Sequence, residues 1–361
     1  MEIIAYYLPQ YYPFKENNEW WGEGFTEWTN VGKASKRYPG HYQPKVPKDL
    51  GYYDLRLVDN QNKQIELAKE AGVTAFCYWH YWFGNGKRLL DKPIASVLKN
   101  KELDFPFCFG WANESWMAKI WSTNGVKGKT LIEQEYPGIN DIINHYEYVK
   151  QFILDNRYLR INNKPVFVIY KPFLIPDLDL FMRTWNNKIS EDGIADSFFF
   201  IAHTLDESEI NILLSKGFDA VNIVRVGAYR YDSDYIKKIP LNLFIYKLLK
   251  CPLILKYSSI SKYFIKQRDY EEDVIPTIIP NWDHTPRSGN RGVVFHNSTP
   301  NLFKKHVMKA FEAIKNKPKD KQVLFLKSWN EWGEGNYMEP DLKYGKQYIE
   351  NLRECKNAVF E

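Results

Sequence analysis

Two glutamates near the end of this 361-residue chain are the residues best suited to do chemistry. Glu331 and Glu334 lie in SWNEWGEGNYMEPD, three positions apart and flanked by tryptophan and tyrosine. Side chains with this spacing on a turn can share one face, with about 5–6 Å between their Cβ atoms. An aromatic, partly dry pocket would push their pKa values apart, leaving one carboxyl as base and the other as acid. The alternative is a pair of solvated loop carboxylates.

Such a carboxyl pair is typical of catalysis at the anomeric carbon of a sugar. Retaining glycosidases hold two carboxyls about 5–5.5 Å apart. Aromatic rings also suit sugars, whose C–H faces stack on them, and 16% of this chain is Phe, Trp or Tyr. The sequence has no HExxH, GxGxxG, Walker A or GxSxG motif, which argues against other common chemistries. We therefore expect an oligosaccharide or polysaccharide as substrate.

Further polar and aromatic side chains follow the expected strands. One of these residues alone would more often belong to a core, but so many at strand ends favour a site. A second WGEG lies near the N-terminus, in EWWGEGFTEWTNV from Glu19 to Val31. The candidate substrate-binding residues are Tyr7, Gln10, Trp28, Trp79, His80, Tyr81, Trp82, Asn113, Glu114, Trp116, Lys171, His203, Trp282, Arg287, Asn330 and Trp332.

Eight short apolar runs, separated by helical patterns, must position these residues. The expected strands are Ile3–Leu8, Val73–Trp79, Phe105–Trp111, Pro165–Tyr170, Ser197–His203, Ala220–Val224, Ile275–Pro280 and Gln322–Ser328. Alternating strands and helices predict an α/β fold, with a (β/α)8 TIM-type barrel preferred over a doubly wound sheet. Strands one and eight are neighbours in a barrel, and active sites lie at its C-terminal rim. The two WGEG copies are thus expected to form two walls of one site.

The chain shows no linker, so we expect a single domain over residues 1–361. Its longest insertions should follow strand one and strand six, and the latter covers about 225–273. Helices are expected from Asp54 to Gly72, from Asn140 to Asn156, and after Thr299, with Gly72 as a C-cap and Thr299 as an N-cap.

Composition narrows the setting and the partners. The net charge of +5, without a basic arm, argues against nucleic acid. Scattered cysteines, no signal peptide and no long apolar run predict a cytoplasmic protein. No cofactor or metal is expected; the DxD formed by Asp177 and Asp179 could hold a metal–diphosphate, but it lies in a proline-flanked loop. Glu331 and Glu339 match an E-x7-E spacing that we interpret as coincidental.

One basic segment, Leu241 to Arg268, combines apolar residues with lysines and lacks acidic residues. A stretch of this kind can lie on an anionic membrane surface. The alternative is an ordinary cap over the barrel. Membrane contact would make the protein peripheral on the inner face of the membrane.

The motifs AYYLPQYY, EWWGEGFTEWTNVGKA, HYQPKVPKDLGYYDLR, AGVTAFCYWHYWF, GWANESW, NWDHTPRSGNRG and SWNEWGEGNYMEP resemble the WbsX-like family. The resemblance runs from about residue 3 to residue 353. It implies a glycosyltransferase of bacterial surface-polysaccharide synthesis, such as O-antigen or capsule. That family is similar to glycoside hydrolase family 99, which comprises endo-acting α-mannan enzymes with a (β/α)8 barrel.

The resemblance to the hydrolases implies a retaining, metal-independent route. Glu331 would be the base that takes the 2-hydroxyl proton, and Glu334 the acid on the leaving oxygen, with a 1,2-anhydro sugar between the two steps. Gly333 departs from the hydrolases, which usually carry a bulkier polar residue there. Three functions remain open: a transferase using an activated donor and an acceptor that is free or lipid-linked, an endo-acting α-glycoside hydrolase, and a non-catalytic glycan-binding barrel.

Overall fold

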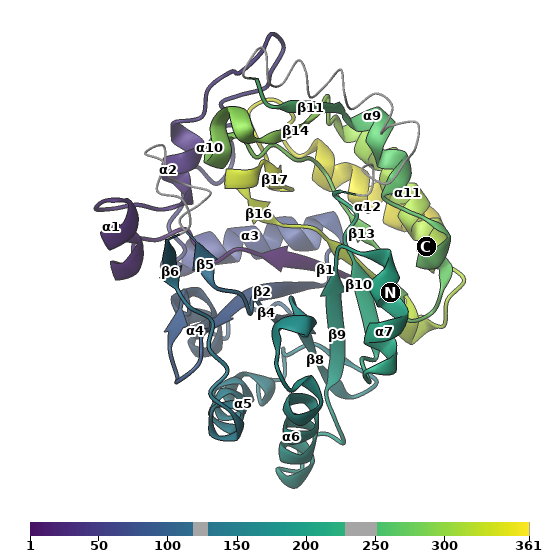
Figure 1. The fold of residues 1–361 in the computed structure, drawn as a ribbon. Helices are drawn as coiled ribbons and strands as arrows, with labels where there is room; N and C mark the ends of the chain where they lie inside the picture. Colours follow the sequence, from purple (N-terminus) through teal and green to yellow (C-terminus); the bar gives the residue numbers. More distant parts are fainter. Residues whose placement is uncertain (118–128, 228–250, 361) are drawn as a thin grey trace.

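Parallel strands form a barrel at the centre of the molecule, with helices around its outside (Figure 1). The computed structural model describes residues 1–117, 129–227 and 251–360. The barrel strands are β1 (Glu2–Tyr7), β2 (Ala75–Trp82), β4 (Phe107–Trp111), β8 (Lys164–Ile169), β9 (Phe199–Thr204), β10 (Ala220–Ile223), β12 (Val274–Ile275), β13 (Thr277–Ile278) and β15 (Val323–Leu326). Every expected strand is present, and the (β/α)8 prediction is confirmed.

The barrel closes through a strand that is split at Pro276. β12 pairs in parallel with β10, whereas β13 pairs in parallel with β15. Proline has no N–H to donate to a ladder, but its carbonyl still accepts a bond from Phe325 N (3.0 Å). Strand seven thus bridges its two neighbours with two short pieces. β1 lies between β2 and β15, so the first and last strands are neighbours as predicted.

Amphipathic helices cover the barrel and bury their apolar faces against it. They are α3 (Val58–Ala71), α4 (Lys92–Lys99), α5 (Ile139–Ile153), α6 (Leu178–Glu191), α7 (Ile210–Ser215), α11 (Pro300–Ile314) and α12 (Gln347–Phe360). α3 ends at Gly72, whose φ of 80° is left-handed and suits glycine. α11 begins after Thr299, whose hydroxyl accepts from Leu302 N. Both expected caps are confirmed.

Short elements in the connecting loops build the rim of the barrel. The insertion after β1 contains α1 (Lys15–Trp21) and α2 (Glu27–Gly32). β16 (Asn330–Glu331) and β17 (Asn336–Tyr337) form a small hairpin after β15. The other short elements are β3 (Arg88–Leu89), β5 (Trp116–Met117), β6 (Thr130–Ile132), β7 (Arg160–Ile161), β11 (Leu253–Lys256), α9 (Tyr257–Ile260), α10 (Thr285–Ser288) and β14 (Val293–His296).

The basic segment is only partly described, because residues 241–250 lie outside the described residues. From residue 251 onward the chain forms β11, which pairs in parallel with β14, and then α9. Leu255, Tyr257 and Phe264 are buried with Phe295 in a small apolar cluster. The apolar side chains of this half therefore pack against the protein, as in the cap alternative. Across the described ranges, none of the helices has the length and apolar character to cross a bilayer.

Candidate active site at the C-terminal rim

The turn after β15 carries both candidate glutamates and is anchored at several points. Asn330 accepts from Leu8 N (2.8 Å) and donates to Leu8 O (3.0 Å), which ties the turn to the end of β1. The Trp332 ring stacks on Tyr337, with 3.7 Å between the ring centroids. Glu331 ends β16, and Glu334 ends the 3-10 turn that follows. The two carboxylates thus stand on a rigid turn at the rim.

A buried carboxyl, Glu339, supports this turn from below. It accepts from Trp332 Nε1 (2.6 Å), Tyr53 OH (2.9 Å) and Gln64 Nε2 (2.6 Å). Burial raises the pKa of Glu339 to about 7, against the effect of these hydrogen bonds. The E-x7-E spacing therefore joins a residue of the candidate pair to a residue that holds the turn in place.

One guanidinium binds both candidate glutamates. Arg287, on α10, contacts Glu331 through Nη2 and Glu334 through Nη1, the latter at 2.5 Å. A third carboxylate, Glu27 of α2, contacts the same guanidinium at Nη2 (3.0 Å) and Nε (3.2 Å). His284 Nε2 lies 3.4 Å from Glu334 Oε1. The site is thus a cluster of three carboxylates around Arg287.

The environment separates the two candidate glutamates in acidity. Burial raises the pKa of Glu331 to about 7; Arg287 opposes the rise, whereas the neighbouring Glu334 and Glu27 carboxylates add to it. Burial would also raise the pKa of Glu334, but Arg287 and His284 outweigh it and hold that pKa well below its usual value. In the free protein the proton therefore resides with Glu331 rather than Glu334. The resemblance implies the opposite order for an acid at Glu334.

The carboxylate pair faces a cavity of about 480 Å3, which falls in the usual size range of small-molecule sites. Eight of the predicted residues line it: Gln10, Trp79, Tyr81, Glu114, Trp116, Arg287, Glu331 and Glu334. Trp21, from the first WGEG copy, and Glu334, from the second, line the same cavity. The two copies therefore do form walls of one cavity.

The structure corrects the prediction that His80 and Trp82, two residues of the YWHYW run, contact the substrate. Side chains alternate between the faces of a strand, so Trp79 and Tyr81 face the cavity while these two face α5. His80 Nε2 lies 2.9 Å from His145 Nε2, and Trp82 Nε1 donates to Asp141 (3.0 Å). Neither side chain lines the cavity.

Five further candidates are also corrections, because they fix the scaffold and do not line the cavity. Tyr7 donates to Gln64 on the helix side of β1 (2.7 Å). Trp28 donates from Nε1 to Tyr53 O (2.7 Å), and Asn113 joins two loops by donating to Lys171 O (2.9 Å). Asn330 and Trp332, described above, complete this group.

Three candidates lie next to the cavity wall, outside its lining residues. Lys171 Nζ lies 4.7 Å from the Tyr170 ring centroid, and Tyr170 itself lines the cavity. The His203 ring is buried behind the same tyrosine, 4.7 Å between centroids. Trp282 belongs to a neighbouring pocket. The structure thus places these three side chains beside the cavity and not among its lining residues, and their contact with a substrate stays a prediction.

Sequence reasoning missed several cavity residues and one buried partner. The missed lining residues with polar or aromatic side chains are Asn17, Trp21, Ser115, Tyr170 and Lys327. Tyr170 and Lys327 directly follow strands, which is a signal that could have found them. Glu27 was missed although it belongs to EWWGEGFTEWTNV, because its position in the sequence does not indicate that its side chain contacts Arg287.

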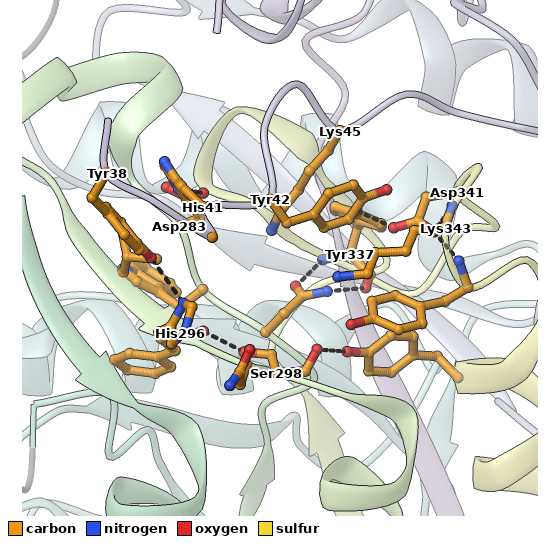
Figure 2. Close-up of a pocket in the computed structure, with 18 residues that line it drawn as sticks. Tyr38, His41, Tyr42, Lys45, Asp283, His296, Ser298, Tyr337, Asp341 and Lys343 are labelled. Atoms are coloured by element: carbon orange, nitrogen blue, oxygen red, sulfur yellow. Dashed lines mark hydrogen bonds and ion pairs between the residues drawn. The ribbon is translucent and has the colours of Figure 1, made fainter. Parts of the chain in front are cut away.

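A second, smaller pocket lies behind the turn (Figure 2). Its volume is about 40 Å3, too small for a sugar ring. Asp283 donates from its backbone N to Glu334 O (2.7 Å) and accepts from Gln43 (2.6 Å), while His41 Nε2 lies 2.8 Å from its carboxylate. Lys45 donates to Gly335 O (3.2 Å). This network holds the Glu334 turn through the backbone carbonyls of Glu334 and Gly335.

The DxD pair has a structural role at one of its members. Asp177 is the N-cap of α6 and accepts from Leu180 N (2.8 Å). Within the described ranges, no group of three or more His, Cys, Asp or Glu side chains is arranged to hold a metal ion.

Comparison with known proteins identifies the family. The sequence matches the family Glycosyltransferase WbsX over residues 3–352. The chain belongs to this family. Two WbsX relatives, each called Uncharacterized protein WxcX, come from two strains of Xanthomonas campestris pv. campestris and are 30% identical over 364 residues. The match covers 98% of this chain but 49% of each relative, so the chain spans about half their length.

The WbsX chain also shares its fold with solved glycoside hydrolases. The GH99 endo-alpha-mannosidase from Bacteroides thetaiotaomicron is 17% identical, with a TM-score of 0.60 over 99% of this chain and 97% of that chain. A structure titled Glycoside hydrolase-like protein is 14% identical, with a TM-score of 0.58 over 99% and 93%. At these identities the likeness concerns the fold alone.

Proposed function

We propose that this protein is a retaining glycosyltransferase of bacterial surface-polysaccharide synthesis, with Glu331 and Glu334 as its acid–base pair. The observation that carries the proposal is the pair itself, bridged by Arg287 at the mouth of an aromatic cavity. Family membership supports the transferase reading. The substrate would be an oligosaccharide or polysaccharide that stacks on Trp79 and Trp116.

The proposed reaction has two balanced steps. First, Glu331 takes the proton of the sugar 2-hydroxyl, the 2-oxygen forms a bond to C1, and the bond from C1 to the leaving oxygen breaks. Glu334 gives its proton to that oxygen. Next, Glu334 takes a proton from the acceptor hydroxyl, whose oxygen attacks C1; the bond from C1 to the 2-oxygen breaks, and the 2-oxygen regains its proton from Glu331. Two inversions at C1 give net retention.

The electrostatics of the free protein set a condition on this assignment. Glu334 acts as the acid only if it receives the proton that the free protein keeps at Glu331. Both carboxyls contact one guanidinium, so they titrate as a coupled group and a proton can relocate between them. A sugar hydroxyl that replaces one contact of Arg287 would drive this relocation. The reverse assignment, with Glu331 as acid, is the alternative that the rescue experiment below tests.

An endo-acting α-glycoside hydrolase is the second candidate. The fold of the GH99 endo-alpha-mannosidase favours it. So does the cavity wall, where Glu114, Glu331 and Glu334 face Arg287 and Lys327 and leave a formal charge, among the described ionisable residues, of −1 with all three carboxyls ionised and of 0 with the proton on Glu331. A wall without net positive charge suits an uncharged leaving group better than a sugar diphosphate. A glycan-binding barrel without activity is the third candidate, which the intact carboxyl pair disfavours.

Product analysis separates these functions. The protein would be incubated with nucleotide-sugars and lipid-linked acceptors, and in parallel with α-linked manno-oligosaccharides. Addition of a sugar to the acceptor is expected. Chain cleavage would replace the transferase with the hydrolase, and binding without turnover would leave the glycan-binding barrel. A chelator is expected to leave the rate unchanged; rescue by manganese or magnesium would contradict the metal-independent route.

A further inference from the structure

Glu27 is the one member of the carboxylate cluster that is closed to substrate. Its side chain is 0% exposed, whereas Glu331 and Glu334 are 12% and 18% exposed. It does not line the cavity, although Arg287, its partner, does. Removing a charge from water is costly unless the charge is paired, so a fully buried carboxylate at this position needs a reason.

The local fold aims this carboxylate at the guanidinium. Glu27 is the first residue of α2, where the Thr26 hydroxyl accepts from Trp28 N and caps the helix. Backbone N–H of Glu27 donates to Gln10 O (3.3 Å), which ties the helix start to the end of β1. Glu27 takes the Nε edge of Arg287, so Nη1 remains for Glu334. Its position fixes the plane of the guanidinium between the two candidate catalytic groups.

Gly333 makes room for this arrangement. A Cβ built on Gly333 would overlap the Glu27 carboxylate and come within 3.0 Å of Arg287 Nε. No other glycine of the turn meets a charged partner of the cluster in this way, since Gly335 would meet Lys45 and Asp283. Glu27 can therefore reach Arg287 only because residue 333 has no side chain. The two residues come from the two segments that contain WGEG.

We propose that Glu27 is a positioning residue of the catalytic site, which holds Arg287 between Glu331 and Glu334 and makes the three carboxylates share one proton. That Glu27 assists catalysis rests on the proposed function. That Glu27 positions Arg287 and shares a proton with Glu331 and Glu334 concerns the free protein and does not depend on any activity. Glu27 touches neither substrate nor reacting atoms and acts through Arg287.

Charge counting shows why a proton is shared. Three ionised carboxylates around one guanidinium leave a formal charge of −2 in a mostly buried cluster, which favours uptake of a proton near neutrality. With Glu27 neutral the same cluster carries −1, and that proton is held less tightly. The titratable and charged groups that face the cluster from the surrounding elements include Tyr11, Lys33, Tyr81, Tyr170, His284 and Lys327.

Titration of the free protein tests the inference without substrate. Carbon-13 NMR of the glutamate carboxyls would follow wild type and Glu27→Gln from pH 5 to pH 9. Wild type should show a titration near pH 7 from Glu331 and another from Glu339, and Glu339→Gln identifies the second. Glu27, whose pKa is also raised by burial, should titrate together with Glu331 as part of the cluster. In Glu27→Gln the apparent pKa of the cluster should fall by roughly one unit or more, because one negative charge is removed. Glu19→Gln, on the exposed face of α1, is the matched control and should change nothing.

A cluster titration that stays near pH 7 in folded Glu27→Gln would overturn the inference. If Glu27→Gln does not fold, Gly333→Ala provides the test. Gly333→Ala should lose its folded state or its activity, and the double variant with Glu27→Ala should regain what was lost. A Gly333→Ala protein with normal folding and activity would overturn the inference. With an active substrate, Glu27→Gln should lower kcat and leave KM unchanged. The limb of the pH–rate profile near pH 7 should shift to lower pH. Absence of any glycan turnover by wild type would defeat the proposed function and leave the titration result valid.

Discussion

At the scale of the residue, burial decides which carboxyls hold protons. Glu331 and Glu339 are both raised in pKa to about 7 by burial, one at the cavity and one beneath the turn. The pKa of Glu334 is lowered instead, because the Arg287 guanidinium and the His284 imidazole face its carboxylate. The same residue type thus has two ionisation states within one turn, as acid–base chemistry at neutral pH requires.

Glu339 should make the stability of the protein fall as the pH rises. Its folded pKa of about 7 lies above the unfolded value near 4.3, so the folded state binds the proton more tightly. The stabilisation is complete below about pH 4 and is lost as the pH rises through 7. We expect the free energy of unfolding to fall between pH 5 and pH 8, by on the order of 2–3 kcal/mol from this group. Urea denaturation of Glu339→Gln should show a flatter profile, and equal slopes would contradict the assignment.

Some residues of the site were predictable from sequence and others were not. The spacing of Glu331 and Glu334 indicated the pair, and strict alternation along β2 could have separated Trp79 and Tyr81 from His80 and Trp82. Glu27 gave no comparable signal, because its partner lies 260 positions away in the chain. A contact made between loops depends on loop conformation, which no local pattern encodes.

At the scale of the element, α1 presents Asn17 and Trp21 to the cavity from one face, since they are four positions apart. Asn17 is fully buried, and neither its amide nitrogen nor its amide oxygen has a hydrogen-bond partner among the described residues. Leaving such groups unpaired costs about 1–3 kcal/mol. Asn17 lines the cavity although it is 0% exposed, so we expect a sugar that enters the cavity to uncover the amide and to provide the missing partner through a hydroxyl.

Asn17→Leu should therefore weaken glycan binding without weakening the fold. Removing an unpaired amide leaves the melting temperature unchanged or raises it, whereas the bound sugar loses its partner. Thermal denaturation and calorimetric titration of Glu334→Gln, with and without Asn17→Leu, would measure both quantities using an α-linked manno-oligosaccharide. Glu19→Ala, on the exposed side of α1, is the control. A loss of more than about 1 kcal/mol of stability would show that Asn17 has a structural role instead.

At the scale of the whole molecule, the barrel followed from the sequence because its strands are nearly continuous apolar runs, buried on both faces. Val166–Ile169, for example, are all 0% exposed. The split of strand seven at Pro276 was not predicted, although a proline inside a strand is a signal for a broken ladder. The basic segment was harder, since Leu255 and Phe264 could cover either lipid or protein, and only their packing against Phe295 decides between the two.

Membrane contact through residues 241–268 stays a prediction, and it now depends on the stretch 241–250 and on exposed lysines such as Lys256. Lysines near an anionic surface contribute roughly 1 kcal/mol each, which salt screens. The protein should co-sediment with anionic vesicles at low salt and be released by high salt, or when Lys247, Lys250 and Lys256 become Glu. Equal sedimentation of wild type and this variant would mean that the segment only covers the barrel.

The roles of the two glutamates are measured by comparing Glu331→Gln and Glu334→Gln on two donors. On the natural glycosyl donor, each variant should lose at least about a hundredfold in rate, which is the usual contribution of an acid or base. On the α-fluoride of the transferred sugar, whose leaving group needs no proton, Glu334→Gln should regain the first step, measured as release of fluoride. With azide as the acceptor, which needs no base, Glu334→Gln should also regain turnover to an α-configured glycosyl azide by proton NMR, and Glu331→Gln should regain neither. Recovery of Glu331→Gln alone would reverse the two roles. Activity of either variant near wild type on the natural donor would show that this glutamate is not part of an acid–base pair.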